Sequence, residues 1–209
     1  MLSKYKTILW DFDGVIMDSM PIRDKGFIEV LKDYPSEQVD RLIDYHQENG
    51  GLSRYVKFRY FFEVIRQESI TEEQVQELAK KFSEIMLKLL CDDKLLIADS
   101  VRFISDNSER YEMHVVSGSD GKELNLICQT LGLTKFFKTI NGSPTPKINL
   151  VASVLTDFKC NPEETVIIGD SKNDYDAAQA NNIDFFGYNN KKVEPLSAFY
   201  IKSFDSLIN

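Results

Sequence analysis

The sequence contains little histidine and little cysteine, and each shortage excludes a kind of site. Its 209 residues include two histidines, His46 and His114, which excludes a metal centre built from several histidines. The three cysteines, Cys91, Cys128 and Cys160, are odd in number and far apart, so neither a disulfide framework nor a cysteine-rich metal site is expected. We expect reduced thiols, as in a cytoplasmic protein.

Positive charge and long apolar runs are also scarce. The chain has 25 Lys and Arg against 33 Asp and Glu, and its net charge of -8 argues against a nucleic-acid-binding surface. No apolar run is long enough to cross a membrane, and the first ten residues lack the apolar length of a signal peptide. We therefore expect a cytoplasmic protein without a nucleic-acid or membrane partner. These features do not determine its oligomeric state.

Apolar residues, in contrast, make up 43% of the chain, which is enough for a real core. Short apolar runs that are followed by a turn and then by helical periodicity are typical of a parallel sheet with helices on both faces. The runs that predict strands are 7–10, 113–116, 138–140, 165–168 and 184–187. Helices are predicted over 121–131, from Lys147 onward and over 174–180. We predict a doubly wound, Rossmann-like α/β core.

Residues 17–91, which we call the helical segment, follow a different pattern because they show helical periodicity alone. Apolar side chains recur at helical spacing within 27–31, 55–65 and 78–89. Gly50-Gly51 interrupts the pattern, and Thr71 is the predicted N-cap of a helix. We predict an α/β catalytic core formed by residues 1–16 and 92–209, with the helical segment inserted as an all-helical cap over the crevice.

The most informative motif, Asp11-Phe12-Asp13-Gly14-Val15, follows directly after the apolar run 7–10. The glycine predicts a turn at the carboxyl end of a buried strand, where open α/β sheets build their ligand crevices. Side chains alternate along an extended segment, so Asp11 and Asp13 share a face. Two such carboxylates repel each other unless a cation or a shared proton compensates them. A divalent metal would let both stay charged, one as a nucleophile and one as a proton carrier.

Three further polar segments follow a predicted strand or begin a predicted helix. They are Ser117-Gly118-Ser119, Pro146-Lys147 and the run 169–174. In a parallel sheet the carboxyl ends of the strands meet at one edge, so these segments and the first motif are expected to form one site. Carboxylate oxygens suit Mg²⁺, while a lysine and helix N-terminal amides suit a phosphate. The combination is typical of phosphoryl transfer, which depends on positioning and charge neutralisation.

Taken in chain order, the four segments resemble the four motifs of the haloacid dehalogenase superfamily of aspartate-nucleophile phosphatases. The residues that match, in motif order, are Asp11 with Asp13, Ser117, Lys147, and Gly169-Asp170 with Asp174. Each match alone is a weak signal, but the ordered set in the expected strand contexts is a strong one. The resemblance covers the whole core, and the helical segment resembles the cap that the family places just after the first motif.

The resemblance implies roles for the reacting residues. Asp11 would attack the phosphorus atom and form an aspartyl-phosphate. Asp13 would protonate the leaving alcohol and later activate the hydrolytic water, while Lys147 would neutralise charge on the nucleophile and on the transferred group. Because a halide leaves without a proton whereas an alkoxide needs one, the presence of Asp13 favours phosphate esters over haloacids.

The resemblance also implies the binding residues and the function. The expected Mg²⁺ ligands are the Asp11 carboxylate, the Asp13 main-chain oxygen and Asp170, with Asp174 supporting the metal directly or through water. Ser117 and the Gly118 amide would hold phosphate oxygens. The expected activity is Mg²⁺-dependent hydrolysis of a small phosphorylated metabolite, such as a sugar phosphate or a phosphoglycolate-like compound.

Two alternatives stay open beside a phosphatase. A β-phosphoglucomutase-like phosphomutase uses the same acid and differs in the lifetime of its phospho-enzyme, which no sequence pattern reveals. A binding or regulatory module on the same fold would have lost turnover. The intact set of Asp11, Asp13, Lys147 and Asp170 argues against that second alternative.

The charged residues of the helical segment carry weaker signals. Arg54, next to the glycine pair, is predicted to bind the non-reacting end of the substrate. Lys57 and Arg59 are expected on a solvated helix face, and His46 is expected at the surface. For Asp18-Ser19, where the chain leaves the core, a hinge cap and a substrate contact are equally good interpretations.

Overall fold

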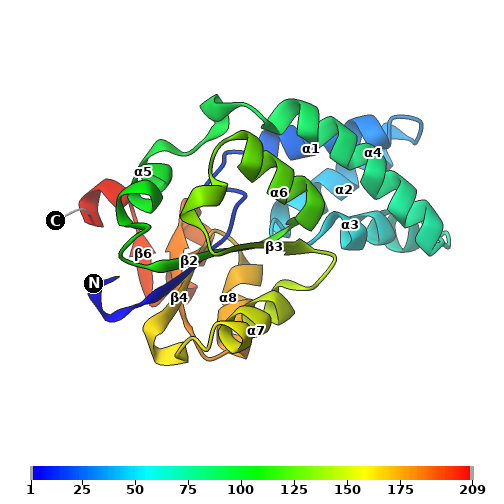
Figure 1. Cartoon of the computed structure of the whole chain (residues 1–209). Coiled ribbons are helices and arrows are strands. Elements are labelled where there is room, and N and C mark those ends of the chain that lie inside the picture. The colour runs from blue at the N-terminus through cyan, green and yellow to red at the C-terminus, as the bar shows by residue number, and fades with distance from the viewer. Residues whose placement is uncertain (1, 208–209) are drawn as a thin grey trace.

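A six-stranded sheet lies at the centre of the protein, in a computed structural model that describes residues 2–207 (Figure 1). In spatial order the strands are β3 (Thr139–Ser143), β2 (Glu112–Asp120), β1 (Thr7–Trp10), β4 (Thr165–Gly169), β5 (Asp184–Tyr188) and β6 (Phe199–Ile201). All neighbouring strands are parallel. From β1 the chain adds β2 and β3 on one side of the sheet. It then crosses to the other side of β1, where it adds β4, β5 and β6. The strand order reverses between β1 and β4, which is where such sheets bind their ligands.

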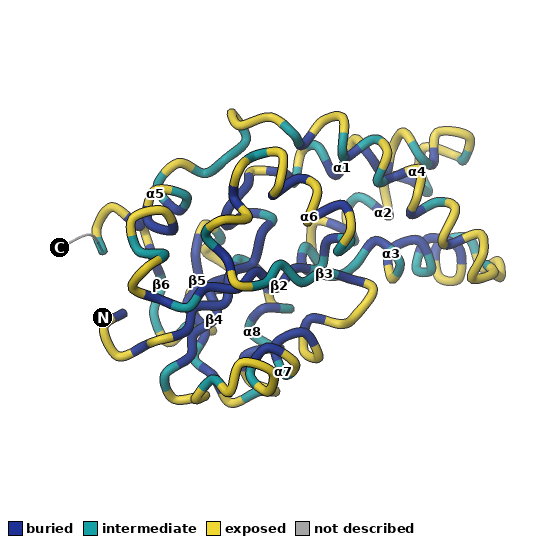
Figure 2. Tube along the Cα trace, viewed as in Figure 1, coloured by how far each residue is buried: buried dark blue, intermediate teal, exposed yellow. Residues whose placement is uncertain are grey.

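Helices cover both faces of this sheet, which confirms the predicted doubly wound α/β fold. The helices on one face are α5 (Ala98–Asn107) and α6 (Gly121–Thr130), and those on the other are α7 (Lys147–Asp157) and α8 (Lys172–Ala180). Ile8 and Trp10 pack in the core on the α5 and α6 side, whereas Leu9 packs on the α7 and α8 side. Because both faces are buried, β1 is a continuous apolar run rather than an alternating one. Its neighbour β4 is likewise buried along its whole length (Figure 2).

The helices of the helical segment gather at one end of the sheet (Figure 1). They are α1 (Met20–Val30), α2 (Ser36–Glu48), α3 (Arg54–Tyr60), the π-helical stretch Phe61–Arg66 and α4 (Glu72–Leu90). The ring of Phe27 packs against those of Phe58 and Phe82, with centroids 5.3 Å and 4.5 Å away. The predicted cap residue Thr71 begins α4 in a capping box with Gln74. The division into a core and a cap at residues 17 and 91 stays a prediction.

The structure differs from the predicted elements in several places, and β3 extends through Ser143, three residues beyond the predicted strand 138–140. Strand β2 continues through Ser117-Gly118-Ser119, whereas the predicted strand ended at Val116 and this segment was expected to follow it. Helix α8 begins at Lys172, two residues before the predicted start, because Ser171 and Asp174 form a capping box there. A sixth strand, β6, follows the last predicted one; its three residues are too few to show a strand period.

Short 3-10 turns connect the remaining elements. They cover Leu2–Lys4, Asp93–Leu95, Thr134–Phe136, Pro162–Glu164, Lys191–Leu196 and Phe204–Leu207. In the described range 2–207, no helix is both long enough and apolar enough to cross a lipid bilayer.

Candidate functional site

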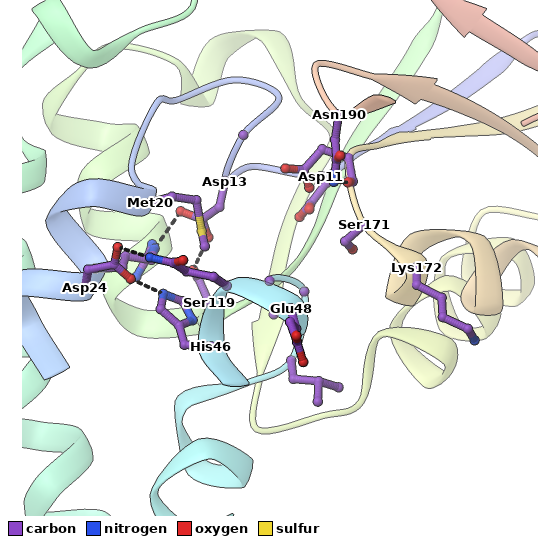
Figure 3. A pocket seen from close by; sticks show the side chains of 18 of the residues that line it. Asp11, Asp13, Met20, Asp24, His46, Glu48, Ser119, Ser171, Lys172 and Asn190 are labelled. Atoms are coloured by element: carbon purple, nitrogen blue, oxygen red, sulfur yellow. Dashed lines mark hydrogen bonds and ion pairs between the residues drawn. The ribbon is translucent and has the colours of Figure 1, made fainter. Parts of the chain in front are cut away.

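The described residues enclose a cavity of about 640 Å³ between the sheet edge and the helical segment (Figure 3). Its sheet side is formed at the carboxyl ends of β1, β2 and β4, beside the point where the strand order reverses. The residues that line this side include Asp11, Asp13, Gly14, Gly118, Ser119 and Asp170. Its helical side includes Arg23, His46, Arg54 and Lys57. The segments predicted to meet at one edge of the sheet do meet there.

A buried lysine joins the first predicted motif to the fourth. Pro146 precedes the first turn of α7, so Lys147 is the first residue of that helix. Its ammonium nitrogen lies 2.9 Å from Asp11 Oδ1 and 2.5 Å from Asp174 Oδ1. The lysine side chain has no exposed surface. Coulomb attraction is strong in such a desolvated place, so Lys147 neutralises part of the charge of two carboxylates at once.

Asp174 is held on both of its oxygens. One oxygen accepts from Lys147, and the other accepts from the amide and the hydroxyl of Ser171, at 3.0 Å and 2.5 Å. The residue is fully buried in the first turn of α8. Its carboxylate therefore fixes the position of Lys147 and closes the turn after Gly169. This geometry matches the supporting role that the motif implies better than the role of a direct ligand.

The turn after β1 leaves space for Asp170. Gly14 has a φ of +77°, and a Cβ atom placed on it would lie 2.1 Å from Asp170 Oδ2. Only glycine combines this backbone conformation with so close an approach. Two asparagines tie the surrounding turns together, because Asn189 donates to the Gly14 carbonyl and Asn190 donates to the Asp170 carbonyl. Asp170 is thereby held beside Asp11.

The carboxylates of this cluster fit a divalent cation. Asp11, Asp170 and Asp174 each offer an oxygen, and these atoms all lie within 4.8 Å of one another. Burial and the charge of Asp174 raise the pKa of Asp11 to about 7. Burial and the charge of Asp11 raise the pKa of Asp170 well above its usual range. Lys147 pairs with two of these three acids and leaves Asp170 without a cationic partner among the described residues, so the cluster has the hard oxygen donors and the excess negative charge that Mg²⁺ prefers.

Asp13 lies in a different environment from Asp11. Its carboxylate accepts from the hydroxyls of Ser19 and Ser119 and, at 2.6 Å, from Arg23 Nε. Burial alone would raise the pKa of Asp13, but Arg23 and the two hydroxyls hold this pKa below its usual value. Asp11 and Asp13 thus have pKa values that are shifted in opposite directions. Such a difference is typical of paired carboxylates with different catalytic roles.

The second predicted motif lies beside the cavity. The sequence analysis included Ser119 in this segment but gave it no role. Ser117 is buried and accepts from the amide of Ser119, while Gly118 and Ser119 line the cavity. A Cβ atom on Gly118 would lie 2.2 Å from the Gly51 carbonyl, so this glycine lets the helical segment approach. Ser119 was detectable, because it follows Ser117 by two residues and therefore shares its face of the strand.

Arg54 lines the cavity, but its guanidinium group is already paired with other side chains. Its guanidinium makes a two-pronged ion pair with Glu123 on α6, at 2.6 Å and 2.8 Å, and donates to the Ser83 hydroxyl. It also lies over the Phe82 ring, 4.5 Å from the centroid. Arg54 therefore links the helical segment to the core. Its predicted role in binding the far end of the substrate stays untested.

Two predictions about the helical segment were wrong. His46 was expected at the surface and Lys57 on a solvated face, yet their exposed fractions are 1% and 2%. Lys57 Nζ lies 2.7 Å from His46 Nδ1, in the wall of the cavity. The periodicity of α3 does not reveal this, because a helix packed on two sides buries polar as well as apolar positions. Arg23 was also missed, although it lies one helical turn after Ser19 and bonds the same carboxylate.

Comparisons with known proteins agree with this geometry. The sequence profile of a family described as haloacid dehalogenase-like hydrolase matches residues 8–188. A phosphoglycolate phosphatase of Colwellia psychrerythraea is 24% identical over 198 residues, which span 90% of this chain and 88% of the relative. A phosphorylated carbohydrates phosphatase of Thermotoga maritima is 22% identical over 186 residues, which span 86% of this chain and 82% of the relative.

A solved structure shows the same fold. The β-phosphoglucomutase of Clostridium difficile aligns with a TM-score of 0.76 and 18% identity, covering 97% of this chain and 93% of that one. At this level of identity the likeness extends to the arrangement of strands and helices, and it does not transfer a substrate.

The crowded carboxylates predict a stabilising effect of Mg²⁺. A carboxyl whose pKa rises on folding keeps its proton longer in the folded chain, so for Asp11 stability falls as the pH rises from 3.8 to about 7. At pH 7.5 Mg²⁺ should therefore raise the melting temperature of the parent protein, whereas Asp170→Asn should lose that response. In EDTA the Asp170→Asn variant should melt above the parent, by about 2–4 °C for each kcal/mol of repulsion removed.

Scanning calorimetry with and without Mg²⁺ measures both effects. Asp44→Asn is a matched control, since Asp44 is exposed on α2 and lies outside the cavity. An equal Mg²⁺ response in the parent and in Asp170→Asn would remove Asp170 from the metal site.

Proposed function

Because the chain belongs to the haloacid dehalogenase-like hydrolase family, we propose that it is a Mg²⁺-dependent phosphatase acting on a small phosphorylated metabolite. The family match and the two phosphatase relatives make the chain a hydrolase of the phosphatase kind. The observation that carries the proposal is the position of Asp11. It directly follows strand β1, contacts Lys147 and lines a cavity of about 640 Å³, large enough for a small phosphorylated molecule.

In the proposed first step, Asp11 attacks the phosphorus atom and becomes an aspartyl-phosphate. Lys147 touches Asp11 Oδ1 and holds that oxygen in place, which leaves Oδ2 as the attacking atom. The other acceptor of Lys147, Asp174, keeps the ammonium from moving away. Positioning of this kind accounts for much of the rate in phosphoryl transfer.

Asp13 is the proposed proton carrier. It gives a proton to the oxygen of the leaving alcohol and then removes one from the water that hydrolyses the aspartyl-phosphate. Ser19, Ser119 and Arg23 hold its carboxylate in one orientation toward the cavity. The ionised form that Arg23 favours is the form that the second step needs.

Mg²⁺ is the proposed cofactor, held by Asp11, Asp170 and the main-chain oxygen of Asp13. When bound, it would offset the charge of the phosphoryl oxygens. We assign Asp174 to Lys147 and Ser171, since both of its oxygens already accept hydrogen bonds. Ser117 and the Gly118 amide are the proposed phosphate contacts.

The helical segment is proposed to act as the cap that excludes water. Asn173 on α8 donates to the Gly51 carbonyl at 2.7 Å, and the Tyr55 hydroxyl donates to Asp120 at 2.7 Å. Together with the pair of Arg54 and Glu123, these contacts hold the glycine turn over the sheet edge. A site closed in this way strengthens each charge interaction inside it.

Asp11→Asn should abolish turnover without unfolding the protein, because an amide has the same shape but is a poor nucleophile. We expect kcat to fall at least about a thousandfold, within the range known for removal of a nucleophile. Inorganic phosphate released from a panel of phosphorylated metabolites measures the loss, and a parallel assay for isomerised sugar phosphate separates hydrolysis from a mutase reaction. Phosphate release within about tenfold of the parent rate would refute the nucleophile assignment.

Asp13→Asn should affect substrates according to their leaving groups. The leaving group of a sugar phosphate is an alkoxide that needs a proton, so hydrolysis of sugar phosphates should slow strongly. The leaving group of an aryl phosphate is a phenolate, which is a much weaker base, so kcat for this substrate should fall less. The ratio of the two kcat values, measured on parent and variant, reports the acid role. Equal losses on both substrates would contradict it.

A further inference from the structure

We propose that the protein has a second metal site, away from the cavity, in which Glu112, His114 and Cys160 bind Zn²⁺. Glu112 and His114 lie on β2, and Cys160 follows α7. Each residue offers one ligand atom, and the three atoms all lie within 4.8 Å of one another. Zinc binding at this place is independent of the proposed phosphatase function.

The register of the sheet separates this zinc site from the Asp11 cluster. Glu112 pairs with Thr7, the first residue of β1, whereas Asp11 follows the last residue of that strand. Gly118, which lines the cavity, lies six residues after Glu112 on β2, or about 20 Å along a strand. The two sites lie at opposite ends of the sheet and share no ligand.

Two parts of the chain meet at the zinc site. Glu112 and His114 are two residues apart on β2, so their side chains point to the same face of the sheet. Helix α7 covers that face, and the amide of Cys160 donates to the Leu155 carbonyl at 3.0 Å, which closes the end of the helix. The ring of Phe158 packs against that of His114, with centroids 4.5 Å apart. The end of α7 thus holds the thiol beside the two ligands of β2.

The distances between the ligand atoms fit a tetrahedral zinc ion. Glu112 Oε1 lies 3.3 Å from His114 Nε2 and 3.7 Å from Cys160 Sγ. Zinc bonds of about 2.0 Å to oxygen and nitrogen and about 2.3 Å to sulfur, at tetrahedral angles, separate such atoms by about 3.3 Å and about 3.5 Å. A hydrogen bond from an N–H group to a carboxylate is usually shorter, at about 2.7–2.9 Å. The observed spacing is therefore that of metal ligands rather than of a close ion pair.

The surroundings of His114 favour Nε2 as its ligand atom. Nδ1 lies 2.8 Å from Thr139 Oγ1, and the same hydroxyl oxygen accepts from the Asn141 amide at 2.7 Å. A hydroxyl oxygen has two lone pairs, so the second one is available for a proton on Nδ1. The lone pair of Nε2 is then directed at the ligand atom of Glu112. Hydrogen bonds of this kind orient the histidines of metal sites.

The charge and the chemistry of the three ligands suit Zn²⁺. A carboxylate and a thiolate together balance its two positive charges, and a neutral imidazole adds none. Within residues 2–207, His114 is the one basic side chain that forms an ion pair with Glu112. The Glu112 side chain is 35% exposed, which leaves a path for the ion and a fourth position for water. Mg²⁺ prefers oxygen ligands alone, so it competes poorly at this site.

Binding also requires the right protonation states. Burial lowers the pKa of His114, although Glu112 acts against this, so the ring is neutral near pH 7. Burial raises the pKa of the Cys160 thiol, which therefore keeps its proton in the metal-free protein. Because a metal binds the thiolate, the bond between zinc and sulfur replaces the S–H bond and one proton passes to the solvent.

Co²⁺ tests the site, since it takes the place of Zn²⁺ and its bond to a thiolate gives a near-ultraviolet charge-transfer band that oxygen ligands do not give. In the unmodified protein with excess Mg²⁺, we expect Co²⁺ to produce this band and Zn²⁺ to remove it. Cys160→Ser should lose the band. Cys91→Ser is the matched control and should keep it, because Cys91 is also half-buried but lies outside the cluster.

Competition with a zinc chelator measures the affinity. Thr139→Val should weaken zinc binding about tenfold to a hundredfold, as for loss of an outer hydrogen bond, and Glu112→Gln should weaken it more, because a ligand is lost. These variants and their reference all carry Asp170→Asn, so that zinc held by the Asp11 cluster does not mask the change.

Each outcome decides one question. The absence of a thiolate band in the parent would overturn the zinc site, and so would a band that survives in Cys160→Ser, since its sulfur would come from another cysteine. If Cys160→Ser does not fold, as judged by circular dichroism, the zinc affinities of Glu112→Gln and Thr139→Val still decide, and equal affinities would contradict the site. None of these measurements uses a phosphate ester, so failure of the proposed phosphatase function would leave them unchanged.

Discussion

The ammonium group of Lys147 lies between Asp11 and Asp174 with no exposed surface, and the arrangement of the site depends on that contact. Removing a lysine and two carboxylates from water costs more than their attraction returns unless each has further partners. The fold supplies them, because Ser171 donates twice to Asp174 and the amide of Phe12 donates to Asp11. The core of β1, β4 and α7 holds these groups at fixed distances. An ion pair of this kind fixes the position of the Asp11 carboxylate; it does little for stability.

The two carboxylates of the first motif show how one short turn creates two chemistries. Asp11 points to a lysine and to other acids, whereas Asp13 points to Arg23 and two hydroxyls. Their pKa values shift in opposite directions as a result. These environments are only two residues apart along the chain, because the partners of Asp11 come from α7 whereas those of Asp13 come from α1, β2 and the turn before α1.

Glu123 connects the two halves of the cavity. Its carboxylate is fully buried on α6 and accepts from both Arg23 and Arg54, which come from different helices of the helical segment. One acid therefore positions two arginines, and one of these in turn holds Asp13. Asp13, the proposed proton carrier, and the two arginines are thus parts of one polar network, which extends from α6 to the first motif.

Sequence patterns alone predicted five of the six sheet strands, the helical segment and the residues of the four motifs, because these depend on local patterns. Apolar runs predict buried strands, and a glycine after a carboxylate predicts a turn. It did not determine what surrounds Lys57 and His46, nor that Arg23 and Ser119 would bond Asp13. Those contacts join α1, α2, α3 and β2, and a periodic pattern does not reveal which polar face packs against another. The burial of Arg23 and Lys57 in the helical segment, beside the cavity that the carboxylates after β1 line, follows from the packing of these elements alone.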